Sequence, residues 1–109
     1  MIDLTPEQWI EKIAKDSEAV VLDVRTAEEY NEGILENAQL LDYHQTAQFL
    51  HELEQMDPKK PYYVYCRSGN RSVYACLLMN KLGFKETYNL LGGIINWSGK
   101  IVNPHVITK

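Results

Sequence analysis

The sequence is poor in several features that mark particular classes of protein. It has two cysteines in 109 residues, no long hydrophobic run, and fewer basic than acidic side chains. Cysteines at positions 66 and 76 are too few and too close for the disulfide framework of a secreted protein, so we expect reduced thiols and a cytoplasmic location. The segment from Met1 to Leu4 lacks a basic stretch followed by an apolar one. We therefore expect no membrane partner, and an export signal removed before Met1 would leave no trace in this sequence.

The shortage of positive charge also limits the partners. With 11 basic and 15 acidic side chains the net charge is −4, which argues against nucleic acid, because nucleic-acid binding favours a basic surface. The three histidines show no ligand spacing with one another or with the cysteines, so we expect no metal site. The composition is otherwise that of an ordinary globular protein, with 45% hydrophobic residues. Residues 1–109 should form one domain, since this length hides roughly 65% of the unfolded surface, and we expect it to be a monomer.

Apolar runs typical of buried strands alternate with helical segments along the whole chain. Ala19 to Leu22, ending at Asp23, is continuously apolar, as expected of a strand buried on both faces of a parallel sheet. The alternation predicts an α/β fold with a central, mainly parallel five-stranded sheet and helices on both faces. The other predicted strands cover residues 2–4, 38–41, 62–65 and 86–90. Helices are predicted from residues 6 and 27, over 46–56 and 72–82, and from residue 94.

For two of these helices the sequence indicates which residues are buried. The first should bury Trp9, Ile10 and Ile13 as its core stripe. The helix over 72–82 is apolar almost all round, which predicts a buried central helix, and Gly83 is its natural C-terminal stop.

The most informative segment is the run Cys66-Arg67-Ser68-Gly69-Asn70-Arg71-Ser72, which joins a predicted strand to a predicted helix. Active sites of open parallel sheets gather beyond the carboxyl ends of the strands, and Cys66 directly follows one. In such a loop, successive backbone N–H groups converge on one point and the helix start adds positive potential. A thiolate at Cys66 would be stabilised there. The alternative is a buried structural cysteine, the usual fate of this residue type, but the electropositive setting is the one that reactive cysteines need.

The small and polar residues of the loop each have a candidate role. Gly69 and Asn70 are residue types that tolerate positive φ, which a tight cradle demands. Ser68 and Ser72 offer hydroxyl donors to the sulfur, although capping of the helix alone would explain Ser72.

The two arginines and the second cysteine differ in what they can do. Arg71, near the helix start, should turn inward and bridge loop carbonyls or bind an anionic donor through its planar fork. Arg67, at the loop tip, either adds positive potential or faces water. Cys76 lies one turn beyond Ser72, and for it core packing is favoured over a role as a resolving cysteine.

The loop resembles the active-site loop of the rhodanese family, the sulfurtransferases that carry a sulfane sulfur as a persulfide on a loop cysteine. Further matching segments follow in the family's order over about residues 2–99: Asp23-Val24-Arg25, Glu28-Glu29-Tyr30, Gly33 to Ala38, Gly83-Phe84, Leu91-Gly92-Gly93-Ile94 and Trp97. One departure is visible. Where many members read Gly-His-Ile-Pro-Gly-Ala, this chain reads Gly33-Ile34-Leu35-Glu36-Asn37-Ala38. Residues beyond Gly99 fall outside the resemblance and are expected to fray.

The resemblance implies a single rhodanese-like domain acting as a sulfurtransferase. Cys66 would take a sulfane sulfur from a donor such as thiosulfate, hold it as a persulfide within residues 67–72, and pass it to cyanide or a thiol. No metal or organic cofactor is then needed, because the cysteine itself is the carrier. Asp23 and Arg25 should support the site, the carboxylate by holding loop backbone donors and the guanidinium by pairing with Glu28 or Glu29.

Two other functions are open. A persulfide shuttle would pass its sulfur only to a protein partner such as a thiol protein, and the short loop should leave Cys66 accessible to it. A cysteine-dependent phosphatase or arsenate reductase uses a similar cradle, but its signature has five residues between cysteine and arginine, where this chain has four. Such an enzyme also requires a leaving-group acid, and neither Asp42 nor Asp57 sits in a recognisable acid-loop motif.

Overall fold

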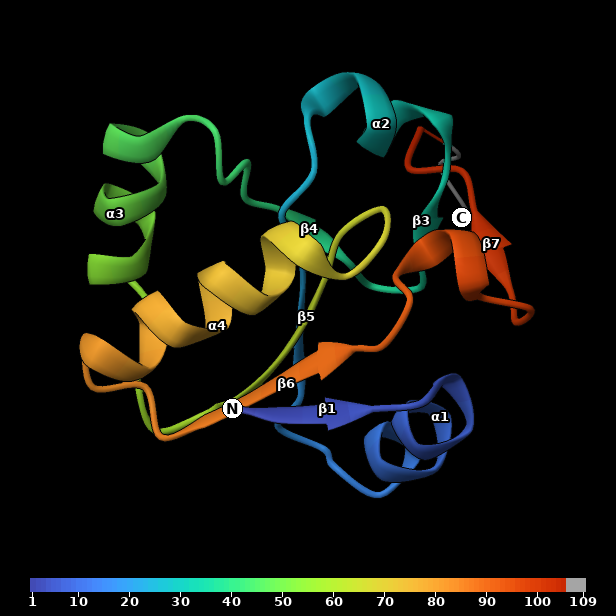
Figure 1. The fold of residues 1–109 in the computed structure, drawn as a ribbon, viewed down its shortest axis with the longest axis horizontal. Coiled ribbons are helices and arrows are strands. Elements are labelled where there is room, and N and C mark those ends of the chain that lie inside the picture. Colours follow the sequence, from blue (N-terminus) through green and yellow to red (C-terminus); the bar gives the residue numbers. More distant parts are fainter. Residues whose placement is uncertain (106–109) are drawn as a thin grey trace.

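The computed structural model describes residues 1–105 and contains the predicted five-stranded sheet (Figure 1). All neighbouring strands in it are parallel, and their order is β1-β6-β5-β2-β4. The central strand β5 is buried along its whole length, which explains its unbroken apolar character. The strands are β1 Ile2–Leu4, β2 Val20–Asp23, β4 Gln39–Leu40, β5 Pro61–Tyr65 and β6 Glu86–Leu90.

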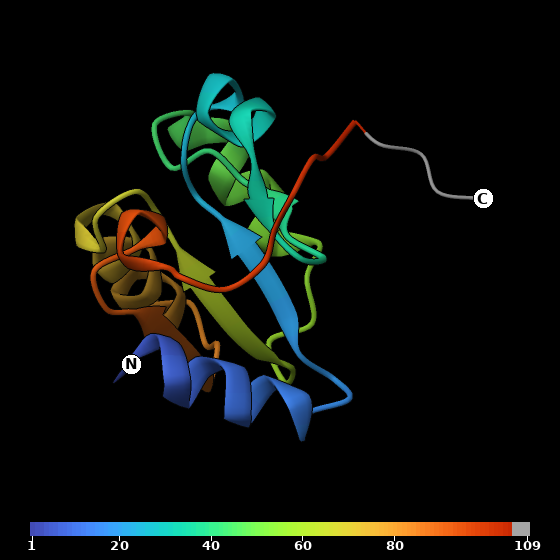
Figure 2. The ribbon, with the colours of Figure 1, turned by 90° about the vertical axis from the view of Figure 1, so that its right-hand side faces the viewer.

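Helices cover both faces of this sheet, as predicted (Figures 1 and 2). Successive side chains of a strand point to opposite faces, so Tyr62 and Val64 join one core cluster while Tyr63 and Tyr65 join the other. The first cluster packs against α3 (Thr46–Glu54) and α4 (Asn70–Lys81), and the second against α1 (Pro6–Ala14). The short α2 (Ala27–Glu32) follows β2.

The residues after Gly99 take part in the fold, contrary to the expectation that they fray. Strand β7 (Ile101–Val102) pairs antiparallel with β3 (Ile34–Leu35), and Figure 2 shows the two segments side by side. This two-stranded sheet was not predicted. Its strand β3 falls in the segment where the sequence departs from the family pattern, and both residues of β3, Ile34 and Leu35, are buried. Residues 106–109 lie outside the described part of the chain.

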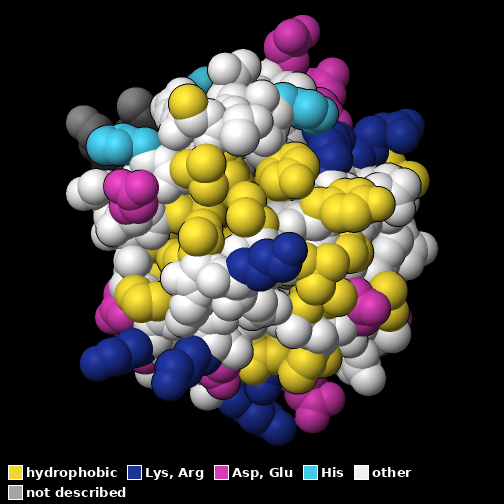
Figure 3. Space-filling model, turned by 60° about the vertical axis from the view of Figure 1, so that its left-hand side comes forward, with side chains coloured by type: hydrophobic (Ala, Val, Ile, Leu, Met, Phe, Trp, Pro, Cys, Tyr) yellow, Lys and Arg dark blue, Asp and Glu magenta, His cyan; other side chains and the backbone are white. Residues whose placement is uncertain are grey.

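Two predicted core assignments are wrong. Ile10 is 49% exposed, so the stripe of α1 consists of Trp9 and Ile13. Helix α4 is buried on one face only, since Tyr74 is 62% and Leu77 is 45% exposed. Hydrophobic side chains accordingly gather on the surface that α4 borders (Figure 3). The last predicted helix is a short 3₁₀ turn, η1 (Ile94–Asn96).

The described residues contain no helix that is long and apolar enough to cross a membrane. The cytoplasmic location expected from the cysteine content stays a prediction.

Candidate active site

The sulfur of Cys66 is surrounded by hydrogen-bond donors at the carboxyl end of the central strand. Cys66 follows β5 directly, and α4 begins four residues later at Asn70. The backbone N–H of Gly69 donates to Sγ at 3.1 Å, and the backbone N–H of Ser72 points to it at 3.4 Å. The Ser72 hydroxyl oxygen lies 3.3 Å from Sγ. The structure therefore brings Cys66, Gly69 and Ser72 together in the cradle that the loop sequence predicts.

These donors favour the charged form of the cysteine. Burial raises the pKa of the Cys66 thiol, because a buried thiolate loses hydration. The hydroxyl and backbone N–H of Ser72, followed by the N–H groups of Gly69 and Ser68, more than offset this cost. The pKa of Cys66 is consequently lower than that of an ordinary cysteine, and the start of α4 adds positive potential in the same sense.

Cys66 is not accessible, contrary to the expectation from the short loop. Its side chain is 0% exposed, whereas the adjoining Arg67 and Ser68 are exposed. The sulfur is therefore covered in this structure, and a reactant needs a local rearrangement to reach Sγ.

The backbone conformation of the loop depends on glycines at two places. Gly69 has φ +98°, whereas Asn70 is the first helical residue, so the prediction of positive φ at Asn70 is wrong. Gly93, at φ +65° and ψ −166°, lies against the loop, where a Cβ atom would overlap the Arg67 carbonyl. This close approach lets η1 donate to the loop. The N–H of Ile94 donates to the Cys66 carbonyl at 3.0 Å, and that of Ile95 to the Arg67 carbonyl at 3.1 Å.

Arg71 turns inward, but its partner is a carboxylate and not a loop carbonyl. Its guanidinium donates to both carboxylate oxygens of Glu29, at 2.9 and 3.0 Å. This bidentate contact with Arg71 lowers the pKa of Glu29 to about 2, against the opposing effect of burial. The Thr26 backbone N–H adds to the lowering. The pair joins α2 to the start of α4, a contact that the sequence analysis missed.

Asp23 and Arg25 pair with each other, so the predicted partners of Arg25, Glu28 and Glu29, are wrong. The Arg25 guanidinium donates to the Asp23 carboxylate at 2.7 Å and to the Gly33 carbonyl at 2.7 Å. Asp23 accepts one loop backbone donor, the N–H of Arg25, at 3.0 Å. This buried pair fixes the segment that leads into β3.

Tyr65 completes the same buried network and was also missed. Its hydroxyl donates to Asp23 at 2.9 Å and accepts from the Leu35 N–H at 3.2 Å. Burial and the nearby Asp23 charge raise the pKa of this tyrosine far above its usual range. The sequence did not single it out, because β5 carries three tyrosines, Tyr62, Tyr63 and Tyr65.

Cys76 is a core residue, as predicted. It is fully buried among the side chains between α4 and the sheet, and both cysteines are free thiols. Burial raises the pKa of Cys76 to about 12, so it is protonated near neutral pH.

A polar chain behind Cys66 is a further feature that the sequence analysis missed. Ser72 Oγ lies 2.5 Å from Asn89 Oδ1, and Asn89 Nδ2 donates to Asp3 Oδ1 at 3.0 Å. Asn89 is 1% exposed within β6, and the amide at a strand position was the available signal.

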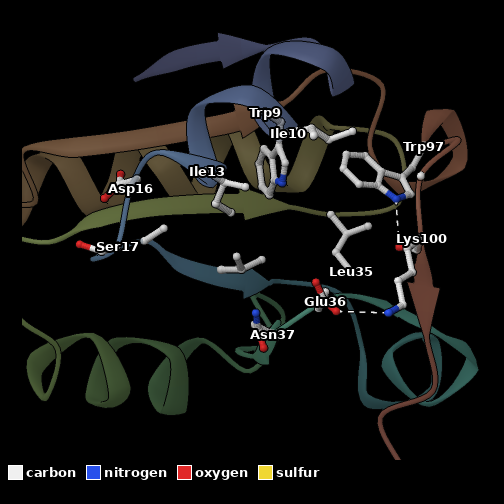
Figure 4. A pocket seen from close by; sticks show the side chains of 13 residues that line it. Trp9, Ile10, Ile13, Asp16, Ser17, Leu35, Glu36, Asn37, Trp97 and Lys100 are labelled. Carbon is white, nitrogen blue, oxygen red and sulfur yellow. Dashed lines mark hydrogen bonds and ion pairs between the residues drawn. The ribbon is translucent and has the colours of Figure 1, made fainter.

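A pocket of about 550 Å³ lies apart from this loop, between α1 and β3 (Figure 4). Trp9 and Ile13 of α1 face Leu35 across it, and Trp97 stands at one end, as a partly exposed pocket wall. No residue of the Cys66 loop lines it, so the candidate chemistry does not lie there. Among residues 1–105, no group of three or more His, Cys, Asp or Glu side chains is placed to hold a metal ion.

Comparison with known families agrees with the fold. A model of the family described as Rhodanese-like domain matches residues 5–100. The chain belongs to the rhodanese-like domain family. The resemblance drawn from the loop and its flanking motifs is thereby confirmed, over nearly the same residues.

Solved rhodanese-like structures share the architecture. A rhodanese-like domain protein from Staphylococcus aureus superposes with a TM-score of 0.79 at 25% identity, covering 92% of this chain and 94% of that one. The rhodanese-like domain of the Alr3790 protein from Anabaena gives a TM-score of 0.82 at 18% identity, covering 100% of this chain and 89% of that one. The likeness to the Anabaena domain shows the fold alone.

The curated relatives carry a different name from a thiosulfate sulfurtransferase. The tRNA uridine(34) hydroxylase of Chlamydia trachomatis serovar L2 is 37% identical over 113 aligned positions, covering 90% of this chain and 34% of that protein. The protein of the same name from Pelagibacter ubique is 33% identical, covering 86% and 31%. The chain thus spans about a third of the length of these relatives.

Proposed function

We propose that this rhodanese-like domain is a sulfurtransferase in which Cys66 carries a sulfane sulfur as a persulfide. The observation that carries the proposal is the cradle, in which two backbone N–H groups and a hydroxyl converge on Sγ at a helix start. The pKa of Cys66 is lowered there, which favours the thiolate needed for attack.

The transfer takes place in two displacements. The Cys66 thiolate attacks the outer sulfur of the donor, so that the Cys66–sulfur bond forms while the donor's sulfur–sulfur bond breaks and, with thiosulfate, sulfite leaves. An acceptor such as cyanide or a thiolate then attacks the outer sulfur, and Cys66 leaves as a thiolate. Because the enzyme is modified between the two steps, ping-pong kinetics are expected.

Arg67 is the better candidate for attracting an anionic donor. The Arg71 guanidinium is occupied by Glu29, whereas Arg67 is exposed and forms no ion pair within residues 1–105. This reverses the weight that the sequence gave to the two arginines. Arg67→Ala should therefore raise the KM for thiosulfate more than the KM for a neutral persulfide donor.

The phosphatase alternative receives little support from the same geometry. The arginine at the end of its signature must hold the substrate anion, and Arg71 instead forms a bidentate ion pair. The two candidate acids are engaged in turns: Asp42 accepts the His44 N–H at 2.8 Å and Asp57 accepts the Lys59 N–H at 2.9 Å.

A second candidate function follows from the relatives. Proteins named tRNA uridine(34) hydroxylase match 90% of this chain, which makes the domain a candidate part of a tRNA-modifying protein. This argues against the exclusion of nucleic acid that the net charge of −4 suggested. Binding of tRNA to the purified chain, measured by fluorescence anisotropy over a salt series, tests this candidate. Saturable binding that weakens with salt supports it, and no binding at low salt opposes it for the isolated domain.

The sulfurtransferase proposal is tested by turnover of thiosulfate with cyanide, followed as thiocyanate. Cys66→Ser should abolish it, while Cys76→Ser should keep most of it, because only Cys66 lies in the cradle. Equal loss in the two folded variants would contradict a single-cysteine mechanism. Loading by a protein persulfide but not by thiosulfate would favour the shuttle over the enzyme.

A further inference from the structure

Asn89 is a buried polar residue that contacts the candidate site through Ser72. It lies on β6 and is 1% exposed, and its Oδ1 is 2.5 Å from Ser72 Oγ. The same Oγ is 3.3 Å from Cys66 Sγ. Ser72 is therefore placed between the sulfur and the Asn89 amide, and it has two neighbours that can accept a hydrogen bond.

The orientation of the Asn89 amide is determined by Asp3. Residues 3 and 89 are register partners in the parallel pair β1 and β6, and Asn89 Nδ2 donates to Asp3 Oδ1 at 3.0 Å. An ionised carboxylate accepts hydrogen bonds and donates none, so the NH₂ group of the amide must face it. The carbonyl oxygen of Asn89 consequently faces Ser72, and Asn89 can only accept there.

A serine hydroxyl has one proton, so Ser72 can donate to Asn89 or to Cys66 but not to both at once. Of the two contacts of Ser72 Oγ, the one to Asn89 is much the shorter, 2.5 Å against 3.3 Å to Sγ, so we infer that the proton lies toward Asn89 when Cys66 is a neutral thiol. The lone pairs of Oγ then face Sγ and accept the thiol S–H. With a neutral Cys66 the side-chain hydrogen bonds can then run in one direction, from Cys66 to Ser72, from Ser72 to Asn89 and from Asn89 to Asp3.

Formation of the thiolate reverses this arrangement. The thiol proton leaves to an external base, and the sulfur can then only accept. The Ser72 hydroxyl must rotate to donate to it, which leaves Asn89 Oδ1 without its donor in a buried site, at a cost in free energy.

We propose that Asn89, oriented by Asp3, is a positioning residue that competes with Cys66 for the Ser72 hydroxyl proton. The inference rests on the proposed function of Cys66 as the sulfur-carrying nucleophile. Each time Cys66 attacks a donor or leaves from the persulfide, the proton changes partner between Asn89 and the sulfur. Asn89 thereby sets how readily the cysteine ionises.

Other charged and titratable groups act on this chain from the neighbouring elements. They are Arg71 and Cys76 on α4, Asp3 on β1, and the N-terminal amino group of Met1, just before β1. A test must therefore separate the proton competition at Ser72 from a change in these charges.

The experiment measures the thiolate fraction of Cys66 against pH, by thiolate absorbance and by the rate of iodoacetamide alkylation, in a Cys76→Ser background. Asn89→Leu removes the acceptor and frees the Ser72 hydroxyl, so we expect about fivefold more thiolate at a pH below the midpoint, the equivalent of one hydrogen bond. In the Ser72→Ala background the same substitution should have no effect. An equal effect in both backgrounds, or no effect in either, would overturn the proposal.

A second pair of variants makes the same test at the edge strand, where folding tolerates change because Asp3 is exposed. Asp3→Asn removes the charge but keeps an acceptor oxygen, whereas Asp3→Ala removes both and lets the Asn89 amide turn over. The thiolate fraction of Cys66 should increase more in Asp3→Ala than in Asp3→Asn. Equal titrations of these two variants would show that Asp3 acts through charge alone.

The titration of Cys66 tests the proton competition separately from the proposed sulfur transfer, because it uses no sulfur donor. If Asn89 and Ser72 are coupled while no persulfide forms, the proton competition stands and the sulfurtransferase proposal fails. If a persulfide forms but Asn89 and Ser72 are not coupled, the sulfurtransferase proposal stands and the proton competition fails.

Discussion

At the scale of single residues, the donors around Cys66 come from positions three and six residues further along the chain. They lower the pKa of Cys66 despite its burial, so this cysteine should alkylate with a midpoint below that of an ordinary thiol, near 8.5. Cys76, whose pKa burial raises to about 12, should stay unreactive at neutral pH. Iodoacetamide labelling against pH, with peptide mapping, measures both. A Cys66 midpoint at the ordinary value would mean that the loop N–H groups do not hold the sulfur.

The burial of Cys66 adds a separate expectation about rates. Because the side chain is 0% exposed, alkylation of its thiolate should be slower than that of a free thiolate of equal pKa. Smaller reagents should react relatively faster than bulky ones. A rate independent of reagent size would show that the loop does not cover the sulfur in solution.

Gly93 supports the loop through its backbone conformation. Its φ of +65° and ψ of −166° suit glycine alone, and a Cβ would also overlap the Arg67 carbonyl. Gly93→Ala should destabilise the fold by at least about 2 kcal/mol and reduce sulfur transfer. Gly83→Ala is the matched control, since Gly83 also has positive φ but nothing lies within 4 Å of the added Cβ. Gly83→Ala should lower the free energy of unfolding but leave sulfur transfer unchanged. Equal losses of transfer in the two variants would contradict the account.

At the scale of elements, the Glu29–Arg71 ion pair joins α2 to the start of α4. The pKa of Glu29 is lowered to about 2 in the folded protein, from an ordinary value of 4.5. A carboxylate with a lowered folded pKa stabilises the fold above the unfolded pKa, and this contribution disappears as the pH falls from about 4.5 to 2.

Glu29→Gln should therefore lower the free energy of unfolding by about 1–2 kcal/mol at pH 7, less than a fully buried pair would cost. The loss should shrink toward zero near pH 2. Urea unfolding at several pH values measures it, with Glu28→Gln, an exposed neighbour, as the control. A pH-independent difference between Glu29→Gln and the parent would show that the effect is not electrostatic.

The small sheet of β3 and β7 gives a second expectation at this scale. A chain ending at Gly99 loses β7 and exposes Ile34 and Leu35, now 5% and 2% exposed. We expect a loss of about 1–3 kcal/mol in urea unfolding. A chain ending at His105 keeps β7 and should match the parent. If both truncated chains are equally stable, the β3–β7 pairing contributes little.

At the scale of the whole molecule, the sequence predicted what local patterns encode. The buried strands and the cysteine loop are continuous runs with strong signals. The five-stranded sheet, and the position of Cys66 at the carboxyl end of one of its strands, were therefore predicted correctly. The two-residue strands β3 and β7 carry no periodicity and were missed. Tyr74 and Leu77 made α4 appear wholly apolar, although both are exposed.

Contacts between distant positions account for some of the errors at the site. The Glu29–Arg71 and Asn89–Asp3 pairs join residues 42 and 86 positions apart, and nothing in the local sequence selects one carboxylate over its neighbour. The error at Arg25 has a different origin: it was assigned to Glu28 or Glu29, whereas the structure pairs it with Asp23, a carboxylate only two residues away.

The central claim is that Cys66 carries sulfur, and intact-mass spectrometry with peptide mapping tests it most directly. The purified chain is incubated with thiosulfate or with a protein persulfide, freed of small molecules, and analysed before and after treatment with dithiothreitol. The account predicts a mass increase of one sulfur atom, located on Cys66, present in Cys76→Ser, absent in Cys66→Ser and removed by the reductant. A folded parent protein that gains no sulfur from either donor, or that gains it on Cys76, would contradict the account.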